Sequence, residues 1–221
     1  MAEFNLMNRK QYLTTWQVTH SSPDLFVIRW FLTVIYFLAI TLMKLRFSPN
    51  GATVFGGLVG ASAAIFVFYE WWLVAALVAM LSSLFDGVDG AIAEIKQQKT
   101  KFGAVLDVVM DRSVEIIWFT SLIFAGVSIN SVIWLGMSIL IMEYVRTKAN
   151  SLGITGAGRI TIAERPTRVI MFFMLNVGVF LIGTENPALT LGVTLLGLIT
   201  AISTIQLFLG FTNQLRHNSG R

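Results

Sequence analysis

A succession of apolar stretches, each close to the length of a membrane-crossing helix, dominates this sequence. A helix needs about 20 apolar residues to cross about 30 Å of hydrocarbon, and lipid cannot hydrogen-bond an open backbone, so the stretches must be helical. The composition agrees, because 55% of the 221 residues are hydrophobic and only 13% are charged. Six membrane spans are predicted, at 51–70, 71–93, 103–126, 131–148, 166–183 and 188–211.

The charges between the predicted spans separate by side of the membrane. One set of connections carries basic residues such as Lys96, Lys99 and Lys101, whereas the other carries Glu70 and Glu185 and no lysine or arginine. The positive-inside rule places the basic side in the cytoplasm. The net charge of +4 therefore follows from topology, and we expect a multi-pass protein of the cell membrane that binds no nucleic acid.

An earlier apolar segment, 25–43, leaves two interpretations open. It is long enough to cross the membrane, but it contains Arg29, and a crossing would place Arg9 and Lys10 outside. We expect an interfacial helix along the cytoplasmic face, with a crossing helix as the alternative.

The composition also excludes several chemistries. There are no cysteines, and the two histidines, His20 and His217, lie near the termini, so thiolate and histidine metal sites are not expected. The predicted architecture is an all-α membrane protein with a single domain over 1–221. It comprises an N-terminal interfacial segment at 1–46 and a six-transmembrane-helix bundle at 47–211.

Four aspartates occur in a fixed register on two consecutive predicted spans. Asp86 and Asp89 are spaced i, i+3, and Asp107 and Asp111 are spaced i, i+4, so each pair lies on one face of its helix. A short loop joins the two helices, which makes them antiparallel neighbours whose acidic pairs can converge. Crowded carboxylates in a low-dielectric site must take up protons or bind cations, and oxygen ligands suit Mg²⁺, Mn²⁺ or Ca²⁺. Two such ions can hold a diphosphate.

This register resembles the signature of the CDP-alcohol phosphatidyltransferases, D-x2-D-G-x2-A-R-x8-G-x3-D-x3-D. The segment Ser48-Pro49-Asn50 with Thr53 is similar to the family's first-span entrance. The resemblance implies six transmembrane helices, an N-terminal interfacial helix, and transfer of a phosphatidyl group from a CDP-linked lipid to an alcohol with release of CMP. The matching positions are Asp86, Asp89, Gly90, Ala93, Gly103, Asp107 and Asp111.

The resemblance also implies roles for these residues. Asp86, Asp89 and Asp107 resemble the ligands of one divalent cation, and Asp86, Asp107 and Asp111 those of a second, with Mg²⁺ or Mn²⁺ as the metal. Asp111 is in addition the family's general base, which takes the proton of the acceptor hydroxyl. The implied nucleotide-binding residues are Gly87, Gly90, Ala93, Asn50 and Thr53.

One position departs from the signature. Glu94 stands where the family has an arginine that helps to hold the phosphates of the nucleotide. A carboxylate there has the wrong sign for this task. Arg112 or a lysine of the 96–101 loop substitutes, or the donor binds differently, or activity is lost.

Basic residues gather around the start of the predicted fifth span. Pro166 fits the first turn of a helix, helix N-termini favour anions, and guanidinium groups suit phosphate. The stretch 144–150 followed by 164–168 is similar to the phosphatidylinositol-phosphate synthase branch, in which basic residues bind the phosphate of the acceptor. Positive-inside topology alone is the alternative explanation. The predicted acceptor-phosphate residues are Arg146, Lys148, Arg159, Arg165 and Arg168.

These features predict an enzyme of phospholipid biosynthesis. It would transfer a phosphatidyl or archaetidyl group to a polyol phosphate, with inositol phosphate favoured over glycerol 3-phosphate, and the family resemblance implies a homodimer. A non-catalytic lipid- or nucleotide-binding relative is the first alternative, because of Glu94. An ion transporter is the second, although its acids would be expected midway along the helices and within an inverted repeat.

Overall fold

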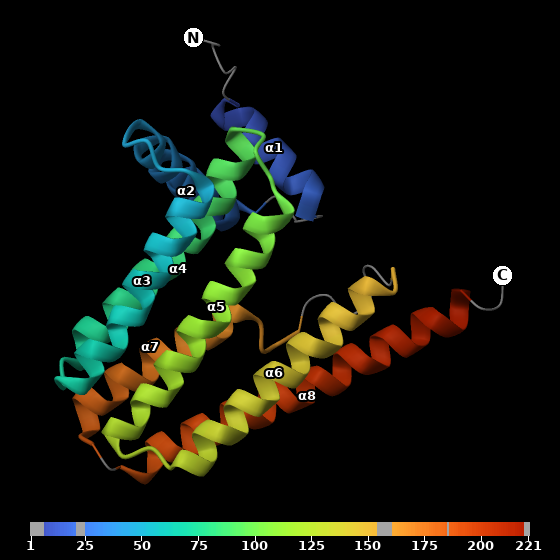
Figure 1. Cartoon of the computed structure of the whole chain (residues 1–221). Helices are drawn as coiled ribbons and strands as arrows, with labels where there is room; N and C mark the ends of the chain where they lie inside the picture. Colours follow the sequence, from blue (N-terminus) through green and yellow to red (C-terminus); the bar gives the residue numbers. More distant parts are fainter. Residues whose placement is uncertain (1–6, 21–24, 154–160, 185, 219–221) are drawn as a thin grey trace. The chain divides into compact units, whose positions relative to one another are not determined.

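The computed structural model describes residues 7–20, 25–153, 161–184 and 186–218, and over these residues the chain is helical with short connections (Figure 1). A 3₁₀ turn, Leu122–Ala125, follows the fifth helix. The α-helices are α1 (Arg9–His20), α2 (Phe26–Lys44), α3 (Pro49–Phe68), α4 (Trp72–Ile95), α5 (Lys101–Ser121), α6 (Ile129–Ser151), α7 (Arg165–Ile182) and α8 (Pro187–Asn218).

Five of these helices are long and apolar enough to cross a membrane. They are α3, α4, α6, α7 and α8, and they coincide with five of the predicted spans. The remaining predicted span, 103–126, corresponds to α5 and the 3₁₀ turn. Helix α5 is not among the five, because Asp107, Asp111, Arg112 and Glu115 lie along it. The acidic residues that suggested a site therefore also reduce the apolar character of the helix.

The helices group into two compact units. The first unit comprises α1, α2, α3 up to Ala61, α4 from Leu81 and α5 up to Val114. Its core joins the N-terminal helices to α4: Leu32 and Ile35 of α2 are buried in one cluster with Val88 and Ile92 of α4. Tyr12 of α1 belongs to the same cluster. Helices α1 and α2 therefore support the part of α4 that carries the first aspartate pair.

Glycines on α3 allow close packing within this unit. A Cβ atom on Gly60 would lie 2.5 Å from Ser82 Oγ on α4 and 2.7 Å from Val114 Cγ1 on α5. Ser82 in turn donates a hydrogen bond of 2.9 Å to the carbonyl of Gly56. Only small residues on α3 permit this approach, which brings α3 close to both α4 and α5.

The second unit contains α6, α7, α8 and the adjoining parts of α3, α4 and α5. Helices α6 and α8 run along each other (Figure 1). Their contact is close at Gly197, where a Cβ atom would lie 2.5 Å from the ring of Trp134. In the same unit Trp118 of α5 stacks on Phe172 of α7, with ring centroids 5.0 Å apart.

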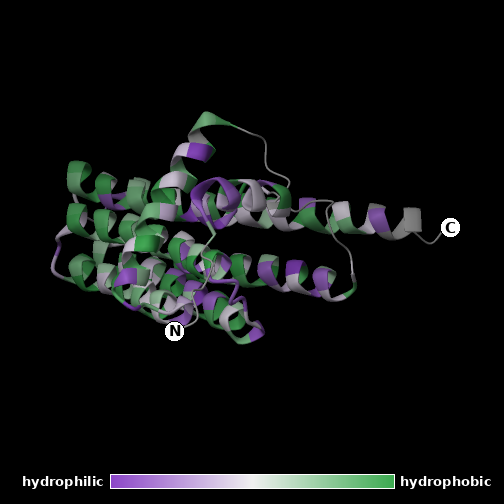
Figure 2. Cartoon of the chain, turned by 90° about the horizontal axis from the view of Figure 1, so that it is seen from above, coloured by the Kyte–Doolittle hydropathy of each residue, from purple (hydrophilic) through white to green (hydrophobic). Residues whose placement is uncertain are grey.

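Hydrophobic residues predominate along the long helices (Figure 2), and many of their large apolar side chains are exposed. Leu58, Ile65, Leu77, Ile133 and Leu181 are each more than half exposed. Soluble monomers rarely expose so much contiguous apolar surface, whereas a bilayer covers it without cost. The chain is therefore a multi-pass integral membrane protein.

Candidate active site

Three of the four predicted metal ligands converge in the first unit. One carboxylate oxygen from each of Asp86, Asp107 and Asp111 lies within 4.8 Å of the other two, and all three side chains are half-buried. Helix α4 supplies Asp86, and the i, i+4 spacing on α5 places Asp107 and Asp111 on the face turned to it. Carboxylate oxygens at this spacing match the ligand preference of hard divalent cations.

The fourth aspartate, Asp89, is outside this group and almost fully buried, with 6% of its surface exposed. Its Oδ1 accepts a hydrogen bond of 2.5 Å from the backbone N–H of Gly90. Its Oδ2 is buried and has no hydrogen-bond partner among the described residues. A buried carboxylate oxygen without a donor is costly, and a cation would satisfy it. Asp89 thus fits a metal-binding role from its own surroundings.

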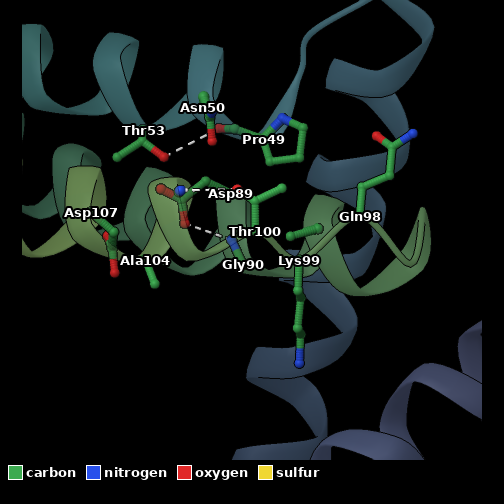
Figure 3. Close-up of a pocket in the computed structure, with 12 residues that line it drawn as sticks. Pro49, Asn50, Thr53, Asp89, Gly90, Gln98, Lys99, Thr100, Ala104 and Asp107 are labelled. Carbon is green, nitrogen blue, oxygen red and sulfur yellow. Dashed lines mark hydrogen bonds between the residues drawn. The ribbon is translucent and has the colours of Figure 1, made fainter.

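A pocket of about 190 Å³ opens where α3, α4 and α5 meet, and Asp107 belongs both to this pocket and to the aspartate group. Figure 3 shows Asn50 and Thr53 on one side and Asp89 and Gly90 across from them. The lining residues are Pro49, Asn50, Thr53, Asp89, Gly90, Ala93, Gln98, Lys99, Thr100, Gly103, Ala104 and Asp107.

Two helix N-termini contribute to this pocket. Ser48 precedes α3 and its Oγ accepts a hydrogen bond of 3.0 Å from Gly51 N–H, while Thr100 precedes α5 and its Oγ1 accepts one of 2.9 Å from Gly103 N–H. First-turn residues of both helices, among them Asn50 and Gly103, line the pocket. The positive ends of the two helix dipoles therefore favour an anionic ligand such as a phosphate.

The glycines of the motif differ in what they do. A Cβ atom on Gly90 would meet nothing within 4 Å, so this glycine leaves open space on the pocket wall. On Gly103 it would lie 2.9 Å from Asn50 Oδ1, so this glycine lets α5 approach the start of α3. Gly87 does not line the pocket: its Cβ would lie 3.1 Å from Ile35 Cδ1, which makes it a packing position against α2.

The pocket thus contains four of the five predicted nucleotide-binding residues, the exception being Gly87. Sequence reasoning considered the lysines of the α4–α5 loop but missed its other pocket residues. Thr100 carried a usable signal, because a threonine immediately before a helix is a preferred N-cap. The remaining residues of this stretch gave no such signal, since their place in the pocket depends on the path of the loop. The residues missed are Gln98, Thr100 and Ala104, whereas Lys99 belongs to the loop lysines offered as substitutes for the missing arginine.

Glu94, at the position that departs from the family signature, forms an ion pair with Lys99. The other residues suggested as substitutes for the missing arginine are used differently. Lys96 donates from Nζ to the carbonyl of Phe47 at 3.0 Å, and Arg112 does not line the pocket. Burial, followed by the negative charge of Glu94, raises the pKa of Tyr12 on α1 to about 12.

In the second unit, two of the basic residues predicted to bind the acceptor phosphate form ion pairs with glutamates. Arg146 donates to both oxygens of Glu164, at 2.8 and 2.7 Å. Arg168 is 1% exposed and donates from Nε to Glu115 at 3.1 Å and from Nη2 to Glu143 at 3.3 Å. Glu115, one turn beyond Asp111 on α5, is therefore a partner of Arg168.

The other three basic residues lie in different settings. Arg165 Nε lies 4.0 Å from Glu115, and 15% of its side chain is exposed. Lys148 is exposed in the last turn of α6. Arg159 lies outside the described residues.

Glu164 itself precedes α7 as its N-cap residue. Its Oε1 accepts hydrogen bonds of 2.8 Å from both the backbone N–H and the hydroxyl of Thr161. Burial alone would raise the pKa of Glu164, but the hydrogen bonds from Arg146 and Thr161 and the charge of Arg146 hold that pKa below its ordinary value. Glu164 is therefore a negatively charged anchor for the start of α7.

Known proteins are similar to this chain in sequence and in fold. The chain is 30% identical over 175 residues to the phosphatidylinositol phosphate synthase of Mycobacterium tuberculosis, covering 75% of this chain and 79% of that protein. It is 27% identical over 172 residues to the archaetidylinositol phosphate synthase of Pyrococcus horikoshii, covering 75% and 84%.

Solved structures agree in fold. The crystal structure of M. tuberculosis phosphatidylinositol phosphate synthase with CDP-DAG bound matches with a TM-score of 0.69 at 23% identity, over 81% of this chain and 94% of that one. The structure of the same enzyme in complex with manganese and citrate matches with a TM-score of 0.69 at 24% identity, over 80% and 88%.

The model of one protein family spans most of the chain. It covers residues 46–206, which include the aspartate group, the pocket and the basic residues around the start of α7. The helical architecture, the aspartate register and these similarities agree with one another: the chain belongs to the CDP-alcohol phosphatidyltransferase family.

Proposed function

We propose that this enzyme transfers the phosphatidyl, or archaetidyl, group of a CDP-linked lipid to inositol phosphate and releases CMP. The observation that carries the proposal is the convergence of Asp86, Asp107 and Asp111, of which Asp107 also lines a pocket formed by two helix N-termini. The choice of acceptor is supported by the relatives, which are named as phosphatidylinositol phosphate and archaetidylinositol phosphate synthases.

The pocket would hold the cytidine diphosphate part of the donor. Asn50 and Thr53 offer polar groups on one wall, while Gly90 and Ala93 leave the opposite wall open to a flat or bulky group. The helix N-termini would attract the diphosphate. The solved structure of a relative with CDP-DAG bound supports a CDP-linked lipid as the donor.

Two divalent cations, Mg²⁺ or Mn²⁺, are proposed as cofactors, held by Asp86, Asp89, Asp107 and Asp111. The donor set fits, because three of the carboxylates converge and the fourth has a buried oxygen without a partner. When bound, the cations would offset the charge of the diphosphate and of the departing phosphate. A relative crystallised in complex with manganese supports the assignment.

Asp111 is proposed as the general base. Its carboxylate would accept the proton of the acceptor hydroxyl as the hydroxyl oxygen forms a bond to the lipid-linked phosphorus. The bond from that phosphorus to the bridging oxygen of the diphosphate then breaks, and CMP leaves with the electron pair. The half-buried position of Asp111 keeps the carboxylate within the site while leaving it accessible to a substrate.

The basic residues of the second unit are proposed to bind the phosphate of the acceptor. Arg146 and Arg168 are held in fixed orientations by carboxylates, and a guanidinium group fixed in this way is preorganised to donate to the oxygens of a phosphate. Lys148 is exposed, so it can reach a ligand directly. The full proposed set is Arg146, Lys148, Arg159, Arg165 and Arg168.

The proposed arrangement in the membrane follows from charge. Helix α5 would be the sixth span alongside the five apolar ones, its charged residues facing the protein rather than lipid. The lysines and arginines of the connections put the active site on the cytoplasmic side. Membrane lipids would surround the bundle, and a homodimer is proposed as the assembled form.

The test is CMP release by the purified protein in lipid nanodiscs. The enzyme would be supplied with CDP-diacylglycerol or CDP-archaeol, with Mg²⁺ or Mn²⁺, and with inositol phosphate, glycerol 3-phosphate or free inositol in separate reactions. We expect inositol phosphate to support the fastest release and the lipid product to carry its mass. Faster release with glycerol 3-phosphate would make that compound the acceptor in place of inositol phosphate. The absence of CMP release with every acceptor would support the non-catalytic alternative.

A further inference from the structure

The ion pair between Glu94 and Lys99 lies at the edge of the candidate nucleotide pocket. Glu94 is in the last turn of α4 and 19% of its side chain is exposed, compared with 59% for Lys99 in the following loop. Lys99 lines the pocket, and Figure 3 shows its side chain extending away from Asn50, Thr53, Asp89 and Gly90. The cation is therefore held at the rim by its acidic partner.

The turn after α4 brings the two residues together. Gln97 adopts a left-handed conformation with φ of 53°. Its N–H donates to the carbonyl of Glu94 at 3.0 Å, and the N–H of Gln98 donates to that of Ala93 at 2.8 Å. This pair of bonds closes the helix and reverses the chain, so that Lys99 returns to the turn that carries Glu94.

Lys99 is also the only basic residue among those that line the pocket within the described part of the chain. The same pocket presents the carboxylates of Asp89 and Asp107. Divalent cations held by these acids would offset their charge, and a further cation on the wall would strengthen the binding of an anionic diphosphate. The ammonium group has three N–H donors, which allows it to keep Glu94 and contact a phosphate at the same time.

We propose that Lys99 is the side chain that contacts the donor's diphosphate in this pocket, and that Glu94 is the residue that positions it. This inference rests on the proposed function, because it assigns a ligand contact within the same site. It makes the glutamate at position 94 part of the donor site.

The experiment compares Lys99→Gln, Lys99→Arg, Glu94→Gln and the double variant Glu94→Gln/Lys99→Gln with the natural protein. The readouts are KM for the CDP-linked lipid and kcat from CMP release, together with the Kd for CDP by calorimetry. The matched control is Lys101→Gln. It removes the same charge at a residue two positions after Lys99 that does not line the pocket.

We expect Lys99→Gln to raise KM and Kd by about tenfold, the usual effect of losing one charged hydrogen bond. Lys99→Arg keeps the cation and should stay within about threefold of the natural protein, as should Lys101→Gln. Glu94→Gln should weaken binding less than Lys99→Gln does, and the double variant should bind as weakly as Lys99→Gln alone.

Two results would overturn the proposal. A double variant that recovers the natural KM would mean that Lys99 only neutralises Glu94. Natural affinity in Lys99→Gln would mean that Lys99 makes no contact. Failure of the proposed function is distinguishable, because the natural protein would then release no CMP while CDP binding still reports on Lys99.

Discussion

The guanidinium group of Arg168 lies 3.1 Å from Glu115, measured from Nε to Oε1, and the two side chains are 1% and 2% exposed. Helix α7 supplies the arginine and α5 the glutamate. Charges this deeply buried need charged partners to compensate for lost solvation, and each of these two is the closest charged partner of the other. Arg168 therefore ties the start of α7 to α5 inside the second unit.

Replacing Arg168 by methionine should lower the free energy of unfolding by about 3–5 kcal/mol, because the buried Glu115 would lose its closest cation and keep Arg165 at 4.0 Å. The double replacement Arg168→Met/Glu115→Leu should recover part of that loss. Urea unfolding in micelles, followed by circular dichroism, measures both. Equal stability of the single and double variants would contradict this account of the pair.

Replacing Asp107 by asparagine should weaken Mn²⁺ binding by at least about tenfold, because even residues that only support a metal ligand have effects of that size. Titration of Mn²⁺ followed by electron paramagnetic resonance measures it, and chelation with EDTA should abolish CMP release. The exposed Glu70 in the α3–α4 turn gives the control, since Glu70→Gln also removes an acid. Natural Mn²⁺ affinity in Asp107→Asn would exclude Asp107 as a ligand.

Alanine at Gly60 and at Gly90 should have opposite consequences. At Gly60 the added methyl group meets Ser82 Oγ and Val114 Cγ1 and should cost about 1–3 kcal/mol of stability through overpacking. At Gly90 it enters open space, so the fold should stay intact while KM for the donor rises. Thermal unfolding and donor kinetics on both variants separate the effects, and a destabilised Gly90→Ala would contradict the open wall.

Acidification should weaken the Arg146–Glu164 anchor. The pKa of Glu164 is lower in the folded protein than its ordinary value, so its contribution to stability is complete above that ordinary value. The contribution is then lost as the pH falls through the folded pKa. The stability difference between the natural protein and Glu164→Gln should therefore be constant near neutral pH and shrink below about pH 4.5. A difference that grows on acidification would refute this sign.

Much of the site could be predicted because helical periodicity is a local property. The spacing of Asp107 and Asp111 placed them on one face, and the short loop made α4 and α5 neighbours, so the convergence with Asp86 followed. The separate environment of Asp89 could not be read from spacing, since it depends on which side of α4 faces the start of α3.

The partners of the charged residues were harder to predict. Arg146 pairs with Glu164, which lies 18 positions later, and Arg168 pairs with Glu115, which lies 53 positions earlier. Nothing in the spacing of these residues joined either pair. Gly87 likewise matched a position expected at the nucleotide, whereas it packs against Ile35 of α2. Such contacts depend on tertiary packing, which local patterns do not specify.

The amide groups at the starts of α3 and α5 have an evolutionary consequence. They belong to the main chain, so substitution of neighbouring side chains leaves them in place unless proline replaces a donor or the helix itself is lost. A binding pocket built on them can tolerate a change of charge nearby, such as a glutamate at position 94, and remain selective for negatively charged ligands. The details of recognition can then diverge among relatives while the chemistry they share persists.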